Sequence, residues 1–126
     1  MVTSVSHPIR GYEDIIAWQK GYELSLRLYD ATRCFPAEER FGLTQQIRRA
    51  AVSVPSNIAE GWGRGTTTDY LRFLRIARGS LYELQTQLRL AADLGYLGER
   101  DSIMPLVAET DRVLNAFIRS VENSRT

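Results

Sequence analysis

The chain has 126 residues, of which 44% are hydrophobic and 25% charged, and its formal net charge is +1. This length suits one domain with its own core, and the composition differs from that of disordered chains. A net charge so near zero argues against a globally basic nucleic-acid binder. We therefore expect a single domain over residues 1–126, with a flexible N-terminal arm at about 1–12 and a short C-terminal tail at about 123–126.

The N-terminal stretch and the cysteine content bear on where the protein works. Residues 1–12 lack the apolar run of a secretory signal, and no window approaches the roughly 20 apolar residues that span a bilayer. Cys34 is the only cysteine, so no intramolecular disulfide can form. These features predict a cytoplasmic protein with no membrane partner.

The first periodic segment, from residue 14 to about residue 33, predicts a helix. Its large apolar residues recur at steps of three and four, which places them on one face. This predicted core face consists of Ile15, Trp18, Tyr22, Leu26 and Tyr29. Pro36 disfavours helical backbone in the residue before it, so the helix should end near Cys34.

A second helix should open at residues 37–39, because the carboxylates of Glu38 and Glu39 would interact favourably with the helix dipole there. Its predicted apolar face consists of Leu43, Ile47, Ala50, Val54 and Ile58. Pro55 removes one backbone hydrogen bond, so we expect a kink in a continuous helix, the alternative being a new helix that starts at Pro55. The glycine-rich run 61–65 should end the helix and make a turn.

Two further helices follow in the same way. Residues 66–69 supply candidate N-caps and an early carboxylate for the third helix, and Gly95 should cap its end. The predicted apolar face of the third helix consists of Leu71, Leu74, Ala77, Leu81, Leu84, Leu88 and Ala91. The fourth helix should begin at about Ser102, with Pro105 in its first turn. Its predicted apolar face consists of Ile103, Leu106, Thr110, Val113, Phe117 and Val121.

Four helices of roughly 20 to 28 residues with short connections predict an all-α fold, an antiparallel up-down-up-down four-helix bundle. Folding the second and third helices back about residues 64–65 would bring residues 50–51 level with Gly79 and Ser80. A glycine inside a helix costs up to about 1 kcal/mol relative to alanine, so we expect a close backbone approach at Gly79. The same pairing would bring Arg49 within about one turn of Glu83.

A second stripe on the predicted second helix is polar and rich in short side chains. With two residues of the third helix it forms a candidate interface or polar network, which comprises Gln45, Arg49, Ser53, Ser56, Asn57, Glu60, Glu83 and Gln87. A solvated outer face and a subunit interface both fit this composition, although a solvated face would normally carry more lysine. We expect Glu60 and Glu83 to be buried, each paired with a nearby arginine.

Arginine is concentrated in the middle of the chain. Between residues 40 and 78 there are seven arginines and two carboxylates, so this segment carries a charge of +5 and the remainder −4. Salt bridges across helices and between subunits are the favoured interpretation, and contacts with the phosphates of RNA or DNA are the alternative. The candidate nucleic-acid contacts are Arg48, Arg49, Arg64, Arg72, Arg75 and Arg78.

The reactive residues are not arranged for catalysis. His7 is the only histidine, which leaves no His-based triad, paired zinc histidines or di-iron motif within one chain. Cys34 has no base beside it, and the glycine run 61–65 follows a helix rather than the strand that precedes a phosphate-binding loop. We therefore expect no enzyme activity, no cofactor, no metal ion and no small-molecule substrate.

Residues 47–61, with the sequence IRRAAVSVPSNIAEG, resemble a bacterial family of four-helix-bundle proteins encoded in intervening sequences of large-subunit ribosomal RNA genes. The resemblance covers about residues 12–120 and includes residues 18–19, 41–43, 79–84 and 94–96. It implies a four-helix subunit, a ring-like homopentamer and no known catalysis. A related accessory protein of diversity-generating retroelements is similar in fold, strongly basic, and binds nucleic acid and a reverse transcriptase; this chain differs in its near-neutral charge.

These observations together predict a non-catalytic homo-oligomeric scaffold or adaptor of the cytoplasm, with the pentameric state implied by the resemblance. The alternative function is RNA or DNA binding through an arginine-rich surface of the assembled oligomer, where copies of the same patch would add their potentials.

Overall fold

The structure is a computed structural model that describes residues 8–98 and 103–124. It contains the helices α1 (Ile16–Ala31), α2 (Leu43–Trp62), α3 (Thr67–Asp93) and α4 (Ile103–Asn123). Short 3-10 turns lie at Tyr12–Asp14, Thr32–Cys34 and Ala37–Glu39. No strand occurs in these two ranges, which confirms the all-α prediction. The expected start of the fourth helix at Ser102 lies outside the described residues, as do residues 1–7 and 125–126 of the expected arm and tail.

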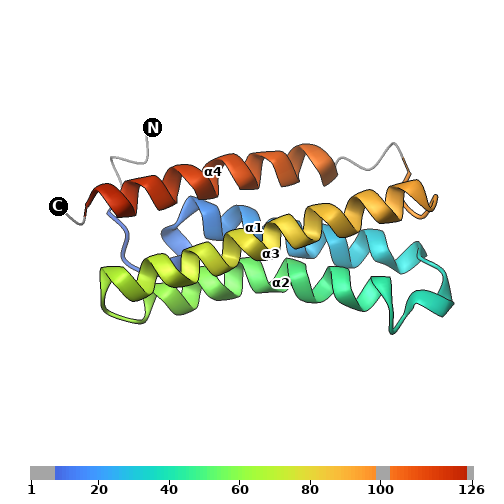
Figure 1. The fold of residues 1–126 in the computed structure, drawn as a ribbon, viewed down its shortest axis with the longest axis horizontal. Helices are drawn as coiled ribbons and strands as arrows, with labels where there is room; N and C mark the ends of the chain where they lie inside the picture. The colour runs from blue at the N-terminus through green and yellow to red at the C-terminus, as the bar shows by residue number, and fades with distance from the viewer. Residues whose placement is uncertain (1–7, 99–102, 125–126) are drawn as a thin grey trace.

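The four helices run alternately in opposite directions along one long axis (Figure 1). Each helix packs against its neighbours in chain order, and α4 packs back on α1. The described helices therefore form the predicted up-down-up-down bundle. None of them combines the length and apolar character needed to cross a membrane.

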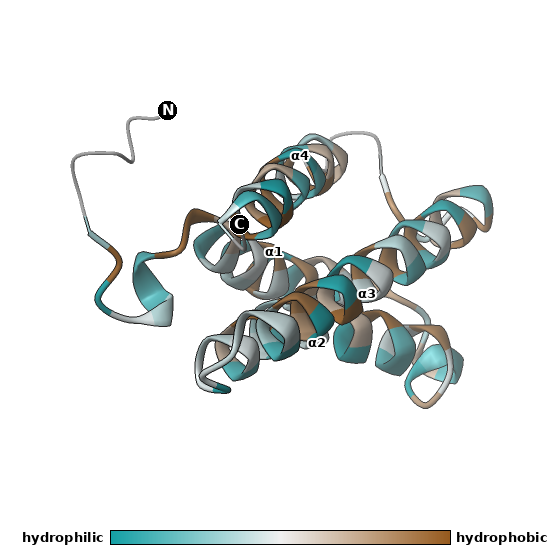
Figure 2. Cartoon of the chain, turned by 60° about the vertical axis from the view of Figure 1, so that its left-hand side comes forward, coloured by the Kyte–Doolittle hydropathy of each residue, from teal (hydrophilic) through white to brown (hydrophobic). Residues whose placement is uncertain are grey.

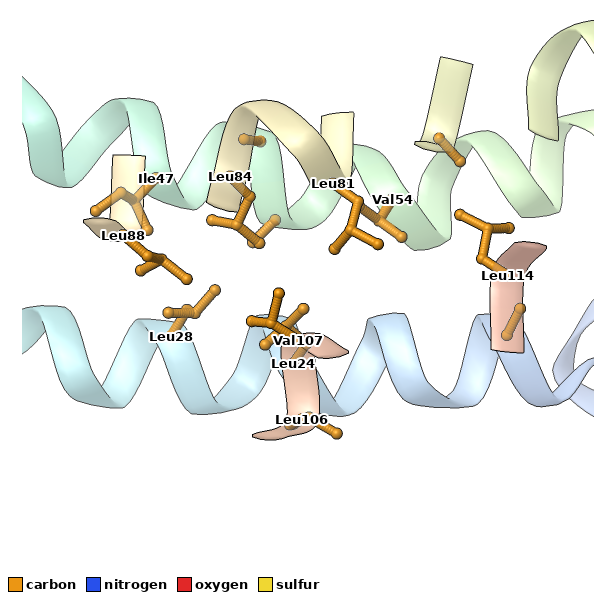
Figure 3. Packing of buried hydrophobic residues seen from close by; sticks show 14 of the residues in the cluster. Leu24, Leu28, Ile47, Val54, Leu81, Leu84, Leu88, Leu106, Val107 and Leu114 are labelled. Atoms are coloured by element: carbon orange, nitrogen blue, oxygen red, sulfur yellow. The ribbon is translucent and has the colours of Figure 1, made fainter. Parts of the chain in front are cut away.

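The bundle axis is filled by aliphatic side chains from all four helices (Figure 3). Hydrophobic segments alternate with hydrophilic ones along the helices, as expected for amphipathic helices around one core (Figure 2). Every residue of the predicted apolar faces of α2 and α3 is buried, so both predictions are confirmed.

The predicted core face of α1 is largely wrong. Of its members Ile15 is buried, but Tyr22, Leu26 and Tyr29 remain 49%, 59% and 43% exposed, and Trp18 is half-buried. The side of α1 that faces the core instead presents Ala17, Gly21, Leu24, Ser25 and Leu28. Both sets follow helical spacing, and the set with the smaller side chains lies against α2. The larger set consequently faces outward.

Gly21 shows why the smaller set is buried. A Cβ placed on Gly21 would lie 3.1 Å from Cγ1 of Val54 and 3.3 Å from Cδ of Pro55. Helix α2 runs without interruption through Pro55, so the continuous-helix prediction is confirmed and the alternative start at Pro55 is wrong. The absence of a side chain at Gly21 leaves room for the proline ring where α1 and α2 touch.

The core face of α4 is only partly as predicted. Ile103, Leu106 and Thr110 are buried as expected, whereas Val113, Phe117 and Val121 are only half-buried at the edge of the core. The second half of the helix instead buries Leu114 and Ile118. The predicted face is therefore displaced by one position along the C-terminal half of the helix.

The start of α2 also differs from the prediction. Residues 37–39 form a separate 3-10 turn, and α2 begins at Leu43. The carboxylate of Glu39 nevertheless acts on this helix, since its Oε1 accepts a hydrogen bond of 3.0 Å from the backbone N–H of Leu43. An N–H group that has no partner within the helix is thereby satisfied.

The turns that follow α2 and α3 form at the glycines predicted from the sequence, and the predicted cap of α3 is present. Thr66 caps α3, because its Oγ1 accepts a hydrogen bond of 3.2 Å from the N–H of Asp69. Gly65 and Gly95 have φ angles of +90° and +82°, which only glycine adopts without strain.

The expected close approach at Gly79 is wrong. Gly79 is exposed, and a Cβ placed there would meet nothing within 4 Å. The predicted level of the two helices is also displaced by nearly one turn, because Ser53, and not residue 50 or 51, lies opposite Ser80, and the two hydroxyls share a hydrogen bond of 2.8 Å. The tight contact between α2 and α3 lies nearer the turn, where a Cβ on Gly61 would lie 2.9 Å from Cβ of Phe73.

Candidate functional site

The outward-facing residues of α1 line a groove between α1 and α2 with a volume of about 400 Å³. We call it the α1–α2 groove, and it is lined by Tyr12, Trp18, Tyr22, Ser25, Leu26, Tyr29, Val52, Pro55, Ser56 and Ala59. Its lining is mostly aromatic and aliphatic. Because the larger apolar stripe of α1 faces away from the core, the groove exposes apolar side chains of α1 beside residues 52–59 of α2.

Aromatic rings form one wall of the groove. The rings of Trp18 and Tyr22 stack with centroids 5.0 Å apart and an interplanar angle of 17°. Tyr12 meets Trp18 edge-on at 5.3 Å, so the 3-10 turn before α1 extends the wall. These contacts fix the rings against each other and give the groove a defined shape in the single chain.

Arg48 lies beside the groove, near the C-terminal end of α1. Its Nε donates a hydrogen bond of 2.8 Å to Oγ1 of Thr32, and its Nη2 donates one of 3.2 Å to the carbonyl oxygen of Tyr29. The guanidinium carbon also lies 4.5 Å from the centroid of the Tyr29 ring. A cation is favourable at the C-terminal end of a helix, and these contacts of Arg48, which belongs to α2, join α2 to α1. Its expected role as a nucleic-acid contact competes with this structural one.

The predicted polar network is only partly assembled. Nδ2 of Asn57 donates hydrogen bonds of 2.8 and 2.9 Å to the carbonyl and hydroxyl oxygens of Ser53, which in turn bonds to Ser80. A separate contact joins Nε2 of Gln87 to Oε2 of Glu83 at 3.2 Å. The exposed remainder of the predicted set consists of Gln45, Arg49, Ser56 and Glu60.

The predicted burial of two carboxylates is wrong. Glu60 and Glu83 are both exposed, since the α2 and α3 positions they occupy face away from the core. No ion pair joins Arg49 to Glu83 among residues 8–98, although α2 and α3 are aligned at that level. Arg49 therefore presents its charge on the outer surface of α2.

The other candidate arginines point in different directions. Nη2 of Arg75 lies 2.7 Å from Oε2 of Glu122, and Nη1 of Arg78 donates a hydrogen bond of 3.1 Å to Oδ1 of Asn115, so both tie α3 to α4. Arg64 and Arg72 lie over the ring of Phe73, at 4.8 and 4.6 Å from its centroid. The six candidate arginines are thus spread over several surfaces and do not form one track.

The residues considered for chemistry are not brought together. Cys34 is exposed at the end of the 3-10 turn that follows α1, and His7 lies outside the described residues. No three His, Cys, Asp or Glu side chains in the described ranges are close enough to hold a metal ion. Burial raises the pKa of Tyr70 to about 12, because its phenol is packed between Trp62 and Phe117.

Sequence reasoning missed the groove because it assigned the groove's wall to the core. A usable signal was present, since α1 carries two periodic sets, one large and aromatic and one small around Gly21. Two apolar faces on one helix indicate that only one can face the core of the same chain.

Comparison with known proteins agrees with this fold. Residues 13–116 match the family described as 23S rRNA-intervening sequence protein. Among solved structures, the chain is similar to a protein with unknown function from the S23 ribosomal protein family of Bacteroides thetaiotaomicron VPI-5482, with a TM-score of 0.75 and 22% sequence identity. That similarity covers 82% of this chain and 96% of that one, and it shows a shared fold. No match was found among curated proteins. The predicted resemblance is confirmed, because a match over residues 13–116 shows that this chain belongs to the family of 23S rRNA-intervening sequence proteins.

Proposed function

We propose that this protein is a non-catalytic scaffold or adaptor of the cytoplasm that works as a homo-oligomer, with a ring-like pentamer as its assembled state. The observation that carries the proposal is the α1–α2 groove. Tyr22, Leu26 and Tyr29 are about half exposed along its wall. Contiguous apolar surface of this kind is costly in water and is typical of sites where proteins associate.

The placement of the charged residues supports a structural function. Arg48, Arg75 and Arg78 each bond to a neighbouring helix, so half of the candidate cations stabilise the bundle. Glu60 and Glu83 are exposed on the outer surfaces of α2 and α3. These side chains are better suited to contacts at the surface than to chemistry.

The molar mass in solution tests the proposal. Light scattering on the column eluate, at micromolar protein, should give about five times the 14.3 kDa of one chain. A different multiple would correct the number of copies. A mass of one chain at that concentration would contradict the scaffold as proposed here.

A second candidate function is RNA or DNA binding, and one observation favours it. Arg64 and Arg72 both lie over the ring of Phe73 near the turn between α2 and α3, and both are exposed. In a ring, repeated copies of this pair would raise the local positive potential. A titration with RNA at several salt concentrations separates this function from the scaffold.

A further inference from the structure

A second stripe of residues at helical spacing lies on the outer side of α3, away from the core, and carries an exposed apolar side chain at each end. We call it the α3 outer stripe, and it consists of Ile76, Gly79, Glu83 and Leu90. The positions are separated by three, four and seven residues, which is the spacing of a coiled-coil seam. Ile76 and Leu90 are 42% and 50% exposed. Helix α3 therefore presents one helix-packing face to the core of its own chain and another to the outside.

Gly79 in this stripe has no explanation within one chain. It lies in the middle of a 27-residue helix, where glycine is less favourable than alanine. A Cβ there would meet nothing within 4 Å, so no neighbour in the same subunit requires its absence. A backbone that approaches from another molecule would require it, since small residues allow two helices to pack closely.

The α1–α2 groove is the surface that we expect such a helix to occupy. The groove lies between two helices, and a helix of a bundle also packs into the space between two neighbouring helices. Its exposed apolar lining would cover Ile76 and Leu90. The short side chains of Ser56 and Ala59 on its α2 side leave room for a close approach.

The charges beside the two surfaces are complementary. Arg49 is exposed one turn before Val52, which lines the groove, and forms no ion pair with the described residues. Glu83 is exposed in the middle of the α3 outer stripe, where its Oε2 accepts a hydrogen bond from the neutral amide of Gln87. A helix that carries Glu83 into the groove of another copy would bring opposite charges together.

We propose that the α3 outer stripe of one subunit packs into the α1–α2 groove of the next. This inference rests on the proposed self-assembly and names the two surfaces that make it. Because the stripe and the groove are different patches of one chain, the contact is heterologous, and its repetition generates a closed ring or an open filament. Homo-oligomer formation would then bury both exposed apolar surfaces at once.

Two variants block one surface each. Leu26→Glu places a charge in the groove, and Gly79→Trp places a bulky ring on the stripe. Both positions are exposed in the single chain, so each variant should keep its helix content by circular dichroism and elute as a monomer. Met104→Glu and Ala116→Trp make matched changes at exposed positions of α4 and should assemble like the wild type.

Mixing the two blocked variants gives the sharpest test. The Gly79→Trp chain retains an intact groove and the Leu26→Glu chain an intact stripe, so an equimolar mixture should form a 1:1 heterodimer that cannot grow further. Each variant alone cannot form this species. If the mixture contains only monomers while each variant stays folded, the heterologous pairing is wrong.

The charge pair supplies an independent test. Arg49→Glu alone and Glu83→Arg alone should each raise the dissociation constant by roughly fivefold, and the double variant should recover most of that loss. An equal loss in all three variants would contradict the pairing. A wild-type protein that is monomeric would overturn self-assembly itself, whereas an oligomer that survives both Leu26→Glu and Gly79→Trp would overturn only this interface.

Discussion

At the scale of single residues, Gly61 marks where α2 and α3 come closest. A Cβ on Gly61 would lie 2.9 Å from Cβ of Phe73 and 3.0 Å from Cδ1 of Tyr70, so an added methyl group must displace helix α3. We expect Gly61→Ala to lower the free energy of unfolding by about 1 to 3 kcal/mol, the usual cost of overpacking. Urea unfolding followed by circular dichroism measures the change.

Gly63 is the matched control, two residues further on. A Cβ there would lie at an ordinary 3.6 Å from the carbonyl oxygen of Glu60, and the φ of −80° at Gly63 suits any residue. Gly63→Ala should leave the free energy of unfolding unchanged or raise it by up to about 1 kcal/mol. Equal stability of the Gly61 and Gly63 variants would show that α3 yields at this contact without cost.

Tyr70 carries a buried hydroxyl with no hydrogen-bond partner among the described residues. A buried polar group without a partner is unfavourable, so Tyr70→Phe should raise the free energy of unfolding by about 1 kcal/mol near neutral pH. Tyr22→Phe, at a ring that is exposed in the single chain, should have no measurable effect when both changes are compared in the monomeric Leu26→Glu variant. A destabilised Tyr70→Phe protein would show that the hydroxyl has a partner after all.

The same residue predicts a dependence on alkaline pH. The pKa of Tyr70 rises from 10.0 to about 12 on folding, because burial disfavours the phenolate. The unfolded chain therefore loses this proton at a lower pH than the folded protein does. The contribution of Tyr70 protonation to the free energy of unfolding is complete below pH 10 and is lost as the pH rises towards 12. Unfolding curves at pH 9 and 11 should show that the free energy of unfolding falls less between these pH values for Tyr70→Phe than for the wild type. Equal losses would contradict the raised pKa.

At the scale of elements, the pair of α1 and α2 depends on Arg48. Its two hydrogen bonds to the end of α1 and its position over Tyr29 join the helices beside the groove. Arg48→Met keeps much of the side chain's length and removes the charge, and should cost about 1 to 2 kcal/mol in the free energy of unfolding. Arg89→Met, at an exposed position of α3, is the control and should change it by less than about 0.5 kcal/mol.

The elements also show how much could be predicted from the sequence. The apolar faces of α2 and α3 were found because each helix carries one dominant set of core residues, from Leu43 and Leu71 onward. The core face of α1 was missed because Gly21 and Ala17 contribute little to a hydropathy pattern, while Trp18, Tyr22 and Leu26 dominate it. Which set is buried depends on the fit of Gly21 against Pro55, and that contact joins different helices.

Some contacts of the candidate site could likewise be predicted from the sequence, and others could not. Asn57 and Ser53 lie four residues apart on one helix, so the sequence could indicate the hydrogen bonds between them, whereas Ser80, the partner of Ser53 on α3, lies nearly one turn from the predicted level. The α1–α2 groove could not be derived once its wall had been assigned to the core. The partners of the arginines could not be predicted either, because these long side chains contact residues that only the tertiary structure brings close.

At the scale of the whole molecule, the net charge of +1 conceals a +5 segment at residues 40–78. Three candidate cations of that segment already bond to neighbouring helices within the described chain, namely Arg48, Arg75 and Arg78. A cation held in this way gains little from a phosphate, because it must first give up its own partner. The chain therefore has fewer arginines in this segment that are available for phosphate contacts than its sequence indicates.

RNA binding, the second candidate function, can be tested by how the affinity depends on salt. A scaffold should show no saturable binding of a single-stranded RNA of about 20 nucleotides at 150 mM salt in fluorescence anisotropy. Cationic contacts with single strands instead give a slope of log K against log salt of about −0.7 for each phosphate engaged. A steep slope that the Arg64→Ala, Arg72→Ala double variant removes would establish the nucleic-acid function. The same pair of changes at the exposed Arg112 and Arg119 of α4 removes equal charge from another face, so only a loss confined to the first variant identifies a site.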